Sequence, residues 1–239
     1  MASETELSDA ITLSVPQPGA HQLRIISPTV LELGVINSKR PDPARVDRWD
    51  LVDANGQLHA PANGELTVLA DGQLIQIQSV GFKRRPWYAP LRQRDLRIAD
   101  YLYLKLAAPV AAGQTVVVQN PSSRLWPADW NFKAKADPFR YSPAIHVNQV
   151  GYLPGFPKSA VVGYYLGNLG ELSIPGSSAF QLIDHQTGRI VFEGVLTPRK
   201  DAGYEYSPPP YQQVLEADFS PFVTPGQISG AQFFRARRP

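Results

Sequence analysis

The sequence predicts an all-β protein made of two tandem β-sandwich domains. Short stretches of alternating apolar and polar residues recur along the chain, and turn residues separate them. No long segment repeats its apolar residues at the spacing of a helix. The length of 239 residues exceeds the roughly 100 residues of one sandwich and fits two. We place the two domains at residues 11–142 and 143–239.

The first domain begins with two predicted strands within residues 21–37, which Ser27-Pro28 separates. Asparagine–glycine and aspartate–glycine pairs at Gly56, Gly64 and Gly72 favour tight turns, because glycine adopts a positive φ at low cost. Further strands of this domain are predicted at residues 48–53, 65–69, 73–80, 97–106 and 114–119.

The boundary between the domains is predicted near Ser142-Pro143, because residues 120–143 contain several prolines and no regular alternation. In the second domain, residues 208–210 are three prolines that donate no backbone hydrogen bond, so they belong to a loop or a sheet edge. Strands of this domain are predicted at residues 145–149, 159–166, 179–184, 189–195 and 212–219.

Composition excludes several classes of protein. The formal net charge of +2 gives no global argument for a nucleic-acid partner. The absence of cysteine excludes disulfides, thiol nucleophiles and thiolate zinc sites. No apolar run approaches the roughly 20 residues that a membrane span requires, so we expect no membrane partner. The first residues, Met-Ala-Ser-Glu-Thr-Glu, lack the basic and apolar regions of a secretory signal.

The most specific motif opens the second domain. Residues 144–154 read Ala-Ile-His-Val-Asn-Gln-Val-Gly-Tyr-Leu-Pro and contain the pattern Asn-Gln-x-Gly-Tyr-x-Pro. Lys158 and the run Ala-Val-Val follow, and further matches lie at residues 180–184 and 217–220. In this order the residues resemble the N-terminal immunoglobulin-like domain of glycoside hydrolase family 9 cellulases. The resemblance implies that the second β-sandwich is immunoglobulin-like and that its matched residues shape the fold.

The resemblance also implies a function. Such a domain is a non-catalytic accessory module that packs against a glycoside hydrolase catalytic domain and stabilises it. The parent enzyme would degrade cellulose or a related β-glucan outside the cell, as a secreted or periplasmic protein. In the family a helical barrel with the catalytic carboxylates follows, whereas here 13 residues follow Gly226. Asp201 begins a run similar to the family's Asp-x-Gly-Asp, but Tyr204 replaces the second carboxylate. We therefore expect no catalytic residue in this chain.

The residues after Gly226 depart from the family pattern, in which an alternating strand completes the sandwich. We expect an open sheet edge there unless Gln232-Phe233-Phe234 supplies a strand. An open edge and an apolar face prepared for a catalytic domain both favour self-association, so a homo-oligomer is expected.

Aromatic residues near cations suggest a contact with carbohydrate. Segment 81–97 is rich in lysine and arginine and contains two of these rings. Aromatic faces act as stacking platforms, so four residues are candidates for binding β-glucan: Trp87, Tyr88, Trp126 and Trp130. Cation–π contacts that hold a long loop, or packing between domains, are the alternative.

The sequence offers weaker signals for a metal. The four histidines are scattered without metal-ligand spacing, so we predict no cofactor. An acidic series leaves calcium as the alternative, although neighbouring arginines favour ion pairing: Asp42, Asp47, Asp50 and Asp53. The second candidate function is a small standalone hydrolase of an ester or lactone that depends on calcium.

Overall fold

The structure is a computed structural model that describes six stretches of the chain. For Tyr88 and residues 231–233 it describes the backbone alone. The described stretches are residues 16–38, 49–88, 96–175, 178–199, 213–223 and 231–233.

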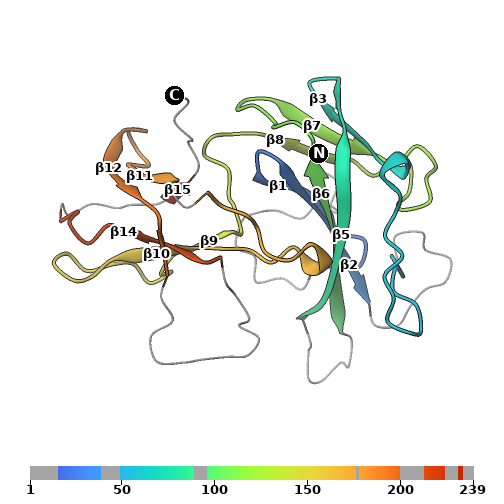
Figure 1. The fold of residues 1–239 in the computed structure, drawn as a ribbon, viewed down its shortest axis with the longest axis horizontal. Helices are drawn as coiled ribbons and strands as arrows, with labels where there is room; N and C mark the ends of the chain where they lie inside the picture. Colours follow the sequence, from blue (N-terminus) through green and yellow to red (C-terminus); the bar gives the residue numbers. More distant parts are fainter. Residues whose placement is uncertain are drawn as a thin grey trace. The chain divides into compact units, whose positions relative to one another are not determined.

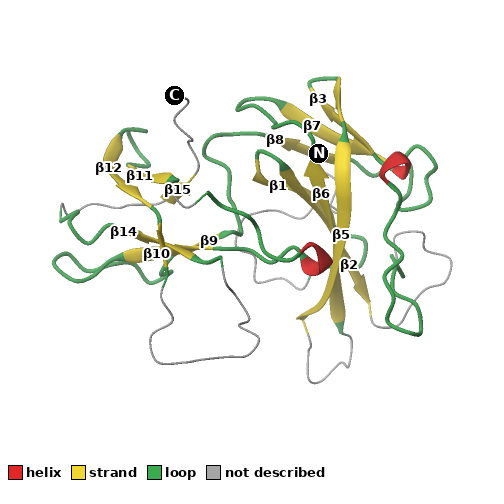
Figure 2. Cartoon of the chain, in the orientation of Figure 1, coloured by secondary structure: helices red, strands yellow, loops and turns green. Residues whose placement is uncertain are grey.

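Antiparallel strands dominate the described residues, and the helical elements among them are two single 3-10 turns, Asn63–Glu65 and Gly167–Leu169 (Figure 2). The all-β prediction is confirmed. Within the described ranges, no helix has the length and apolar character that crossing a membrane requires.

The chain divides into two compact units, which are described separately below. Unit 1 comprises the residues up to Tyr141 together with the short segment Leu166–Leu169. Unit 2 comprises Ser142–Tyr165 and the residues from Gly170 onward.

Unit 1 is a sandwich of two four-stranded antiparallel sheets (Figure 1). The first sheet has the order β1-β2-β6-β5, with β1 His21–Ser27, β2 Val30–Ser38, β6 Arg97–Leu106 and β5 Ile77–Tyr88. The second has the order β4-β3-β7-β8, with β4 Gln73–Ile75, β3 Thr67–Ala70, β7 Thr115–Gln119 and β8 Phe132–Lys135.

Alternation along the strands places the core of unit 1 between its sheets. On β2, Leu31 and Leu33 are fully buried and lie opposite Leu104 and Leu102 of β6. These leucines belong to one cluster with apolar residues of the second sheet, such as Val116. Burying each leucine stabilises the folded chain by about 1.5–3 kcal/mol, so this period-2 pattern fixes which face of the sheet turns inward.

The hairpin between β3 and β4 follows the predicted turn chemistry. Asp71 and Gly72 adopt φ values of 47° and 81°, in the left-handed region that this aspartate–glycine pair tolerates. The Asp71 carboxylate accepts a 2.9 Å hydrogen bond from Thr115 N on β7. The turn therefore also fastens the neighbouring strand.

Segment 166–169 packs against β5 within unit 1. The Asn168 Oδ1 accepts a 2.7 Å hydrogen bond from Phe82 N. Gly167 has φ +63°, and a Cβ there would lie 2.0 Å from Phe82 O. Close approach of the two backbones therefore requires glycine at this position.

Unit 2 is a second β-sandwich. One sheet has the order β13-β14-β10-β9, with β13 Thr197–Pro198, β14 Leu215–Asp218, β10 Ser159–Val162 and β9 Ile145–His146. The other has the order β12-β11-β15, with β12 Ile190–Val195, β11 Ala179–Ile183 and β15 Ala231–Phe233. Four strands facing three is the arrangement of immunoglobulin sandwiches. A small core that includes Val162, Phe180, Leu196 and Phe219 fills the space between the sheets.

The described residues after Gly226, Ala231–Phe233, form strand β15. Residues 231–233 pair antiparallel with β11, with Gln232 opposite Gln181 and Phe233 opposite Phe180. Of the two alternatives that the sequence left open, the structure has the one in which this segment covers the edge of β11. Phe234 lies outside the described residues.

Several strand predictions differ from the structure. Residues 73–80, expected as one strand, form β4 and the beginning of β5. The described part of the strand expected at residues 48–53 contains a single bridge, between Val52 and Leu58. Strand β5 continues through the basic segment to Tyr88, where a loop was expected. Strand β8, Phe132–Lys135, was not predicted at all.

Candidate functional site

Trp126, one of the four predicted sugar-binding aromatics, belongs to the core of unit 1. Its side chain is 2% exposed. The ring packs edge-on against Phe132 at 4.7 Å and lies tilted to Trp49 at 6.4 Å. Trp49 in turn donates a 2.6 Å hydrogen bond from Nε1 to Leu125 O. Because its faces are used by the core, Trp126 has none available for a sugar.

Trp130 is half-buried and lies beside the first strand. Its ring stacks on His21 at 4.2 Å with an interplanar angle of 8°. His21 is buried and forms a 2.9 Å hydrogen bond between Nδ1 and Gly19 O. One face of Trp130 is therefore covered by an imidazole that β1 holds in place.

Trp87 is the predicted aromatic residue with the most accessible side chain in the described structure, at 41% exposure. The Arg85 guanidinium carbon lies 4.7 Å over its ring, a cation–π geometry. The side chain of Tyr88 lies outside the described residues. Trp87 is on β5 and Trp130 stacks on β1, and these strands are the opposite edges of one sheet. The four predicted residues therefore do not form one continuous platform.

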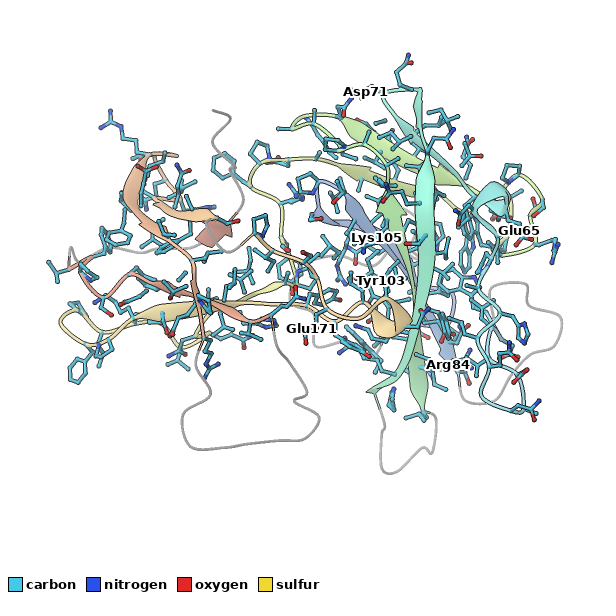
Figure 3. The ribbon with its side chains drawn as sticks, viewed as in Figure 1. Glu65, Asp71, Arg84, Tyr103, Lys105 and Glu171 are labelled. Carbon is cyan, nitrogen blue, oxygen red and sulfur yellow. The ribbon has the colours of Figure 1, made fainter. Side chains whose placement is uncertain are left out.

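The cations of β5 make cation–π contacts, as the alternative interpretation of this segment expected. Lys83 Nζ lies 5.2 Å from the ring centres of both Tyr101 and Tyr103, and burial lowers the pKa of Lys83 to about 8. Arg85 also reaches Tyr101, donating a 3.3 Å hydrogen bond to its hydroxyl. Figure 3 shows Tyr103 and Lys105 on β6, and Arg84 on β5. Arg92 and Arg94 lie outside the described residues.

A groove lined by cations lies between β1 and β8, which are edge strands of the two sheets of unit 1 as far as the chain is described. We call it the basic groove, and its volume is about 240 Å³. Cationic residues line it from three segments, and no aspartate or glutamate is among the lining residues. The titratable and aromatic lining residues are His21, Arg24, Lys133, Lys135, Arg140 and Tyr141.

Two arginines of the basic groove are held in fixed positions. Arg24 Nη1 is 3.3 Å from the buried Glu32 Oε1, and its guanidinium carbon lies 5.7 Å from the ring centre of Tyr141. Arg140 donates hydrogen bonds to two carbonyls, from Nε to Ile25 O at 2.9 Å and from Nη1 to Asp137 O at 3.1 Å. Desolvation by burial lowers the pKa of Arg140.

Sequence reasoning missed the basic groove. No strand and no candidate site was predicted at Lys133 and Lys135, although they alternate with the inward-facing Phe132 and Ala134. That alternation is a strand signal that places both lysines on one face. Nothing in the sequence indicated that this strand ends a sheet beside β1.

The carboxylates of the acidic series that the structure describes form hydrogen bonds and ion pairs with neighbouring residues. Asp53 Oδ1 accepts hydrogen bonds from Asn55 N and Gln57 N, and Oδ2 lies 3.0 Å from His59 Nε2. Asp50 lies 3.4 Å from Arg84 Nη2. Asp42 and Asp47 lie outside the described residues, as does Asp201. Among the residues that the structure describes, no cluster of three potential metal ligands occurs.

The motif that opens unit 2 forms a hydrogen-bonded turn. The Tyr152 hydroxyl accepts a hydrogen bond from Asn148 N at 2.9 Å and donates one to Ser159 O at 2.6 Å. The Asn148 side chain accepts a 3.0 Å bond from Val150 N. Gly151 has φ +106°, which favours glycine at this point of the turn. These motif residues shape the fold, as the sequence predicted.

Lys158, also part of the motif, has an unusually buried ammonium group. The residue is 4% exposed, and Nζ donates to Phe156 O at 2.9 Å and to Ser220 O at 3.1 Å. Ser220 Oγ accepts a bond from Lys158 N and donates one to Asp218 Oδ1 at 2.6 Å. Lys158 and residues 218–220 thus form one hydrogen-bond network, which joins the start of β10 to the end of β14.

The turn also presents apolar side chains to solvent. We call residues 147–156 the apolar loop, and three of its side chains are more than 60% exposed. These are Val150 at 97%, Leu153 at 66% and Phe156 at 63%. Exposed apolar groups that cluster on one loop are typical of a protein–protein contact.

Comparison with known proteins supports the interpretation of this motif. Residues 140–228 match the family model described as the cellulase N-terminal ig-like domain. A comparison with curated proteins gives no significant match.

Among solved structures, the chain is similar to the crystal structure of pullulanase type I from Bacillus subtilis str. 168 complexed with maltose, at 9% identity and a TM-score of 0.22. The similarity covers 93% of this chain and 23% of that chain, so this chain spans less than a quarter of that length. A likeness this weak carries no information about the function of the chain. The family match, in contrast, confirms the resemblance found in the sequence: residues 140–228 correspond to a cellulase N-terminal ig-like domain.

Proposed function

We propose that the chain is a non-catalytic accessory region of a family 9 glycoside hydrolase of the cellulase type. The observation that carries this proposal is the match of residues 140–228 to the cellulase N-terminal ig-like domain. In this proposal the chain acts outside the cell, in a secreted or periplasmic enzyme. It supports a catalytic domain that degrades β-glucan.

Hydrogen bonding within the motif supports a structural role. Asn148, Tyr152 and Lys158 direct their polar groups to backbone partners inside unit 2. Groups committed to backbone partners in this way are not free to act as acid, base or nucleophile. The motif therefore serves to hold the apolar loop in a defined shape.

The apolar loop supplies the contact with the catalytic domain. Val150, Leu153 and Phe156 project from a turn that the Tyr152 hydroxyl fixes at both sides. Covering three such side chains removes apolar surface from water, which is favourable by about 25 cal/mol per Å² of buried area. A fixed loop loses little conformational entropy on binding, so less of that free energy is lost to ordering the loop.

Direct contact with β-glucan is a second element of the proposal and concerns unit 1. Trp87 and Trp130 are the predicted aromatics whose rings remain partly accessible in the described residues. We expect insoluble cellulose to retain the wild-type chain and to retain the variants Trp87→Ala and Trp130→Ala less strongly. Equal retention of the wild type and both variants would exclude these two rings.

The accessory role is tested with a separately produced family 9 catalytic domain. We expect the chain alone to release no sugar from carboxymethyl-cellulose, and the mixture to have a higher melting temperature than the catalytic domain alone. The double variant Leu153→Ser/Phe156→Ser should lose this stabilisation. Leu74→Ser is the matched control, because Leu74 is 63% exposed and lies on β4 of unit 1.

Two results would contradict the accessory role. One is turnover of a glucan by the chain alone that disappears when one of its own carboxylates is substituted. The other is an unchanged melting temperature of the catalytic domain in the presence of saturating chain.

A further inference from the structure

We propose that the basic groove of unit 1 binds the carboxylate groups of an anionic oligosaccharide, such as an oligouronate. The choice of a saccharide rests on the proposed function, whereas the preference for an anion follows from the groove alone. No residue of the groove belongs to the segment that matches the cellulase N-terminal ig-like domain, except Arg140 and Tyr141 at its first two positions.

Two of the groove's cationic side chains have no acidic partner in the described part of the chain, whereas Arg24 is paired with the buried Glu32. Lys133 and Lys135 are exposed, and no hydrogen bond or ion pair of their ammonium groups occurs among the described residues. Arg140 is partly buried and donates to the carbonyls of Ile25 and Asp137. A partly buried guanidinium whose hydrogen bonds go to neutral carbonyls attracts an anion more strongly than an exposed one, because water screens the interaction poorly there.

Protection of a sheet edge explains only part of this pattern. Lysines on an edge strand prevent pairing with other chains, and β8 is an edge strand. Such protection needs exposed charges alone. It does not account for Arg140, which is partly buried and bonded to the carbonyl of Ile25 on β1.

The spacing of the cations fits an extended ligand. Lys133 and Lys135 lie two residues apart on one strand, so their Cα atoms are about 7 Å apart on the same face. Arg24 and Arg140 lie on the other side of the groove, near β1. A chain that carries carboxylates at regular intervals meets cations along its whole length in such a groove, whereas a single small anion would meet only some of them.

Neutral groups of the groove favour a saccharide. Gln22 and Asn131 line it and carry amides suited to hydroxyl groups. Tyr141 is 52% exposed, and its ring offers a face on which a sugar can stack. Guanidinium groups bind carboxylates through paired hydrogen bonds. The combination of cation, amide and accessible ring is what a carboxylated sugar requires.

Isothermal titration calorimetry of the full chain with trigalacturonate tests the proposal. We expect saturable binding that weakens as salt is raised, because salt screens the charges. The double variant Lys133→Gln/Lys135→Gln should bind about tenfold more weakly. The matched control is Lys105→Gln/Arg124→Gln, which removes the same charge from exposed positions of unit 1 outside the groove. This control should bind as the wild type does.

Three outcomes would overturn the proposal. Equal weakening in the groove variant and the control would mean that the net charge alone attracts the ligand. Binding of cellotriose as strong as that of trigalacturonate would exclude a role for carboxylates. Tighter binding of a glutamate oligopeptide than of trigalacturonate would assign the groove to an acidic peptide instead. None of these outcomes changes the melting temperature of a family 9 catalytic domain, so the accessory role stands or falls separately.

Discussion

Arg84 and Asp100 form a bidentate ion pair at the end of the core of unit 1. Arg84 donates from Nε to Asp100 Oδ1 at 2.6 Å and from Nη2 to Oδ2 at 3.2 Å. Asn37 donates a third hydrogen bond to this carboxylate, at 2.9 Å. Burial raises the pKa of Asp100, and the hydrogen bonds from Arg84 oppose that shift. The side chain of Asp100 is fully buried, so its charge depends on these partners.

Substitution of Arg84 by methionine is expected to destabilise unit 1 by about 2–3 kcal/mol. The change leaves a buried carboxylate without its cation, which costs about 3–5 kcal/mol for fully buried pairs, and Arg84 is 36% exposed. All four tryptophans lie in unit 1, so tryptophan fluorescence during urea unfolding reports on this unit.

Arg85→Met is the control for this prediction. Arg85 lies on the same strand and packs over Trp87 and Tyr101, contacts worth about 0.5–1 kcal/mol at exposed sites. A loss of stability in Arg84→Met no larger than in Arg85→Met would show that the ion pair contributes little.

Two glycines with positive φ test the packing of segment 166–169. Gly167→Ala should destabilise unit 1 far more than Gly170→Ala destabilises the chain. Both substitutions place a side chain in the left-handed region, at a cost of about 1–2 kcal/mol. Only at Gly167 would the new Cβ also meet Phe82 O, whereas nothing lies within 4 Å of a Cβ at Gly170. Thermal unfolding of both variants measures the difference, and equal melting temperatures would contradict the close approach.

Removal of one hydroxyl should loosen the turn that carries the apolar loop. Tyr152→Phe deletes the acceptor for Asn148 N and the donor to Ser159 O, and each hydrogen bond contributes about 0.5–1.5 kcal/mol. We expect faster hydrogen exchange of the Asn148 amide and of β10. Amides of β2 and β6 in unit 1 serve as the internal control and should not change. Unchanged exchange at Asn148 would contradict the role of the hydroxyl.

Acid should destabilise unit 2 through Asp184 and Asp218. The side-chain hydrogen bond from Thr187 lowers the pKa of Asp184, and that from Ser220 lowers the pKa of Asp218. A carboxyl with a lowered pKa stabilises the fold above its unfolded pKa of 3.8, and this contribution disappears as the pH falls through the folded pKa. NMR titration of the carboxyl carbons should show Thr187→Val raising the pKa of Asp184 alone. A pKa of Asp184 that stays unchanged in this variant would contradict the assignment.

Self-association is expected at high protein concentration, through the apolar loop. Analytical ultracentrifugation of the wild type should show a dimer or larger species, because Val150, Leu153 and Phe156 are exposed together. Leu153→Ser/Phe156→Ser should shift the chain to monomer, and Leu74→Ser should not. A clean monomer for the wild type would show that this loop does not bind a second copy.

Alternation and turn chemistry were sufficient to predict most strands. Residues 97–106 were predicted as a strand and form β6, Arg97–Leu106, most of whose residues are buried. The aspartate–glycine pair at Gly72 fixed the β3–β4 hairpin for the same kind of local reason. Local patterns failed where charge masked them. The charges of residues 83–85 hid the continuation of β5, where Lys83 and Arg85 lie over Tyr101 of the neighbouring strand.

The burial of individual side chains and the order of the strands in each sheet could not be predicted from the sequence, and the candidate site depends on both. Trp126 and Trp130 are four residues apart, yet one lies in the core and the other stacks on His21. The basic groove depends on β1 and β8 being the edges of different sheets, which is a long-range property. The family motif was predictable because its function is local: Asn148 and Tyr152 contact each other across one turn.

Segment 166–169 has a consequence for synthesis on the ribosome. Unit 1 takes in Asn168, whereas β9 and β10 of unit 2 precede this residue in the chain. At about 5–20 residues per second, residue 169 emerges roughly 1–6 s after residue 141. During that interval the Phe82 amide has no Asn168 to receive its hydrogen bond. The ribosome must therefore begin to synthesise the second sandwich before the first one is complete. A gene that ends after residue 141 would encode unit 1 without segment 166–169.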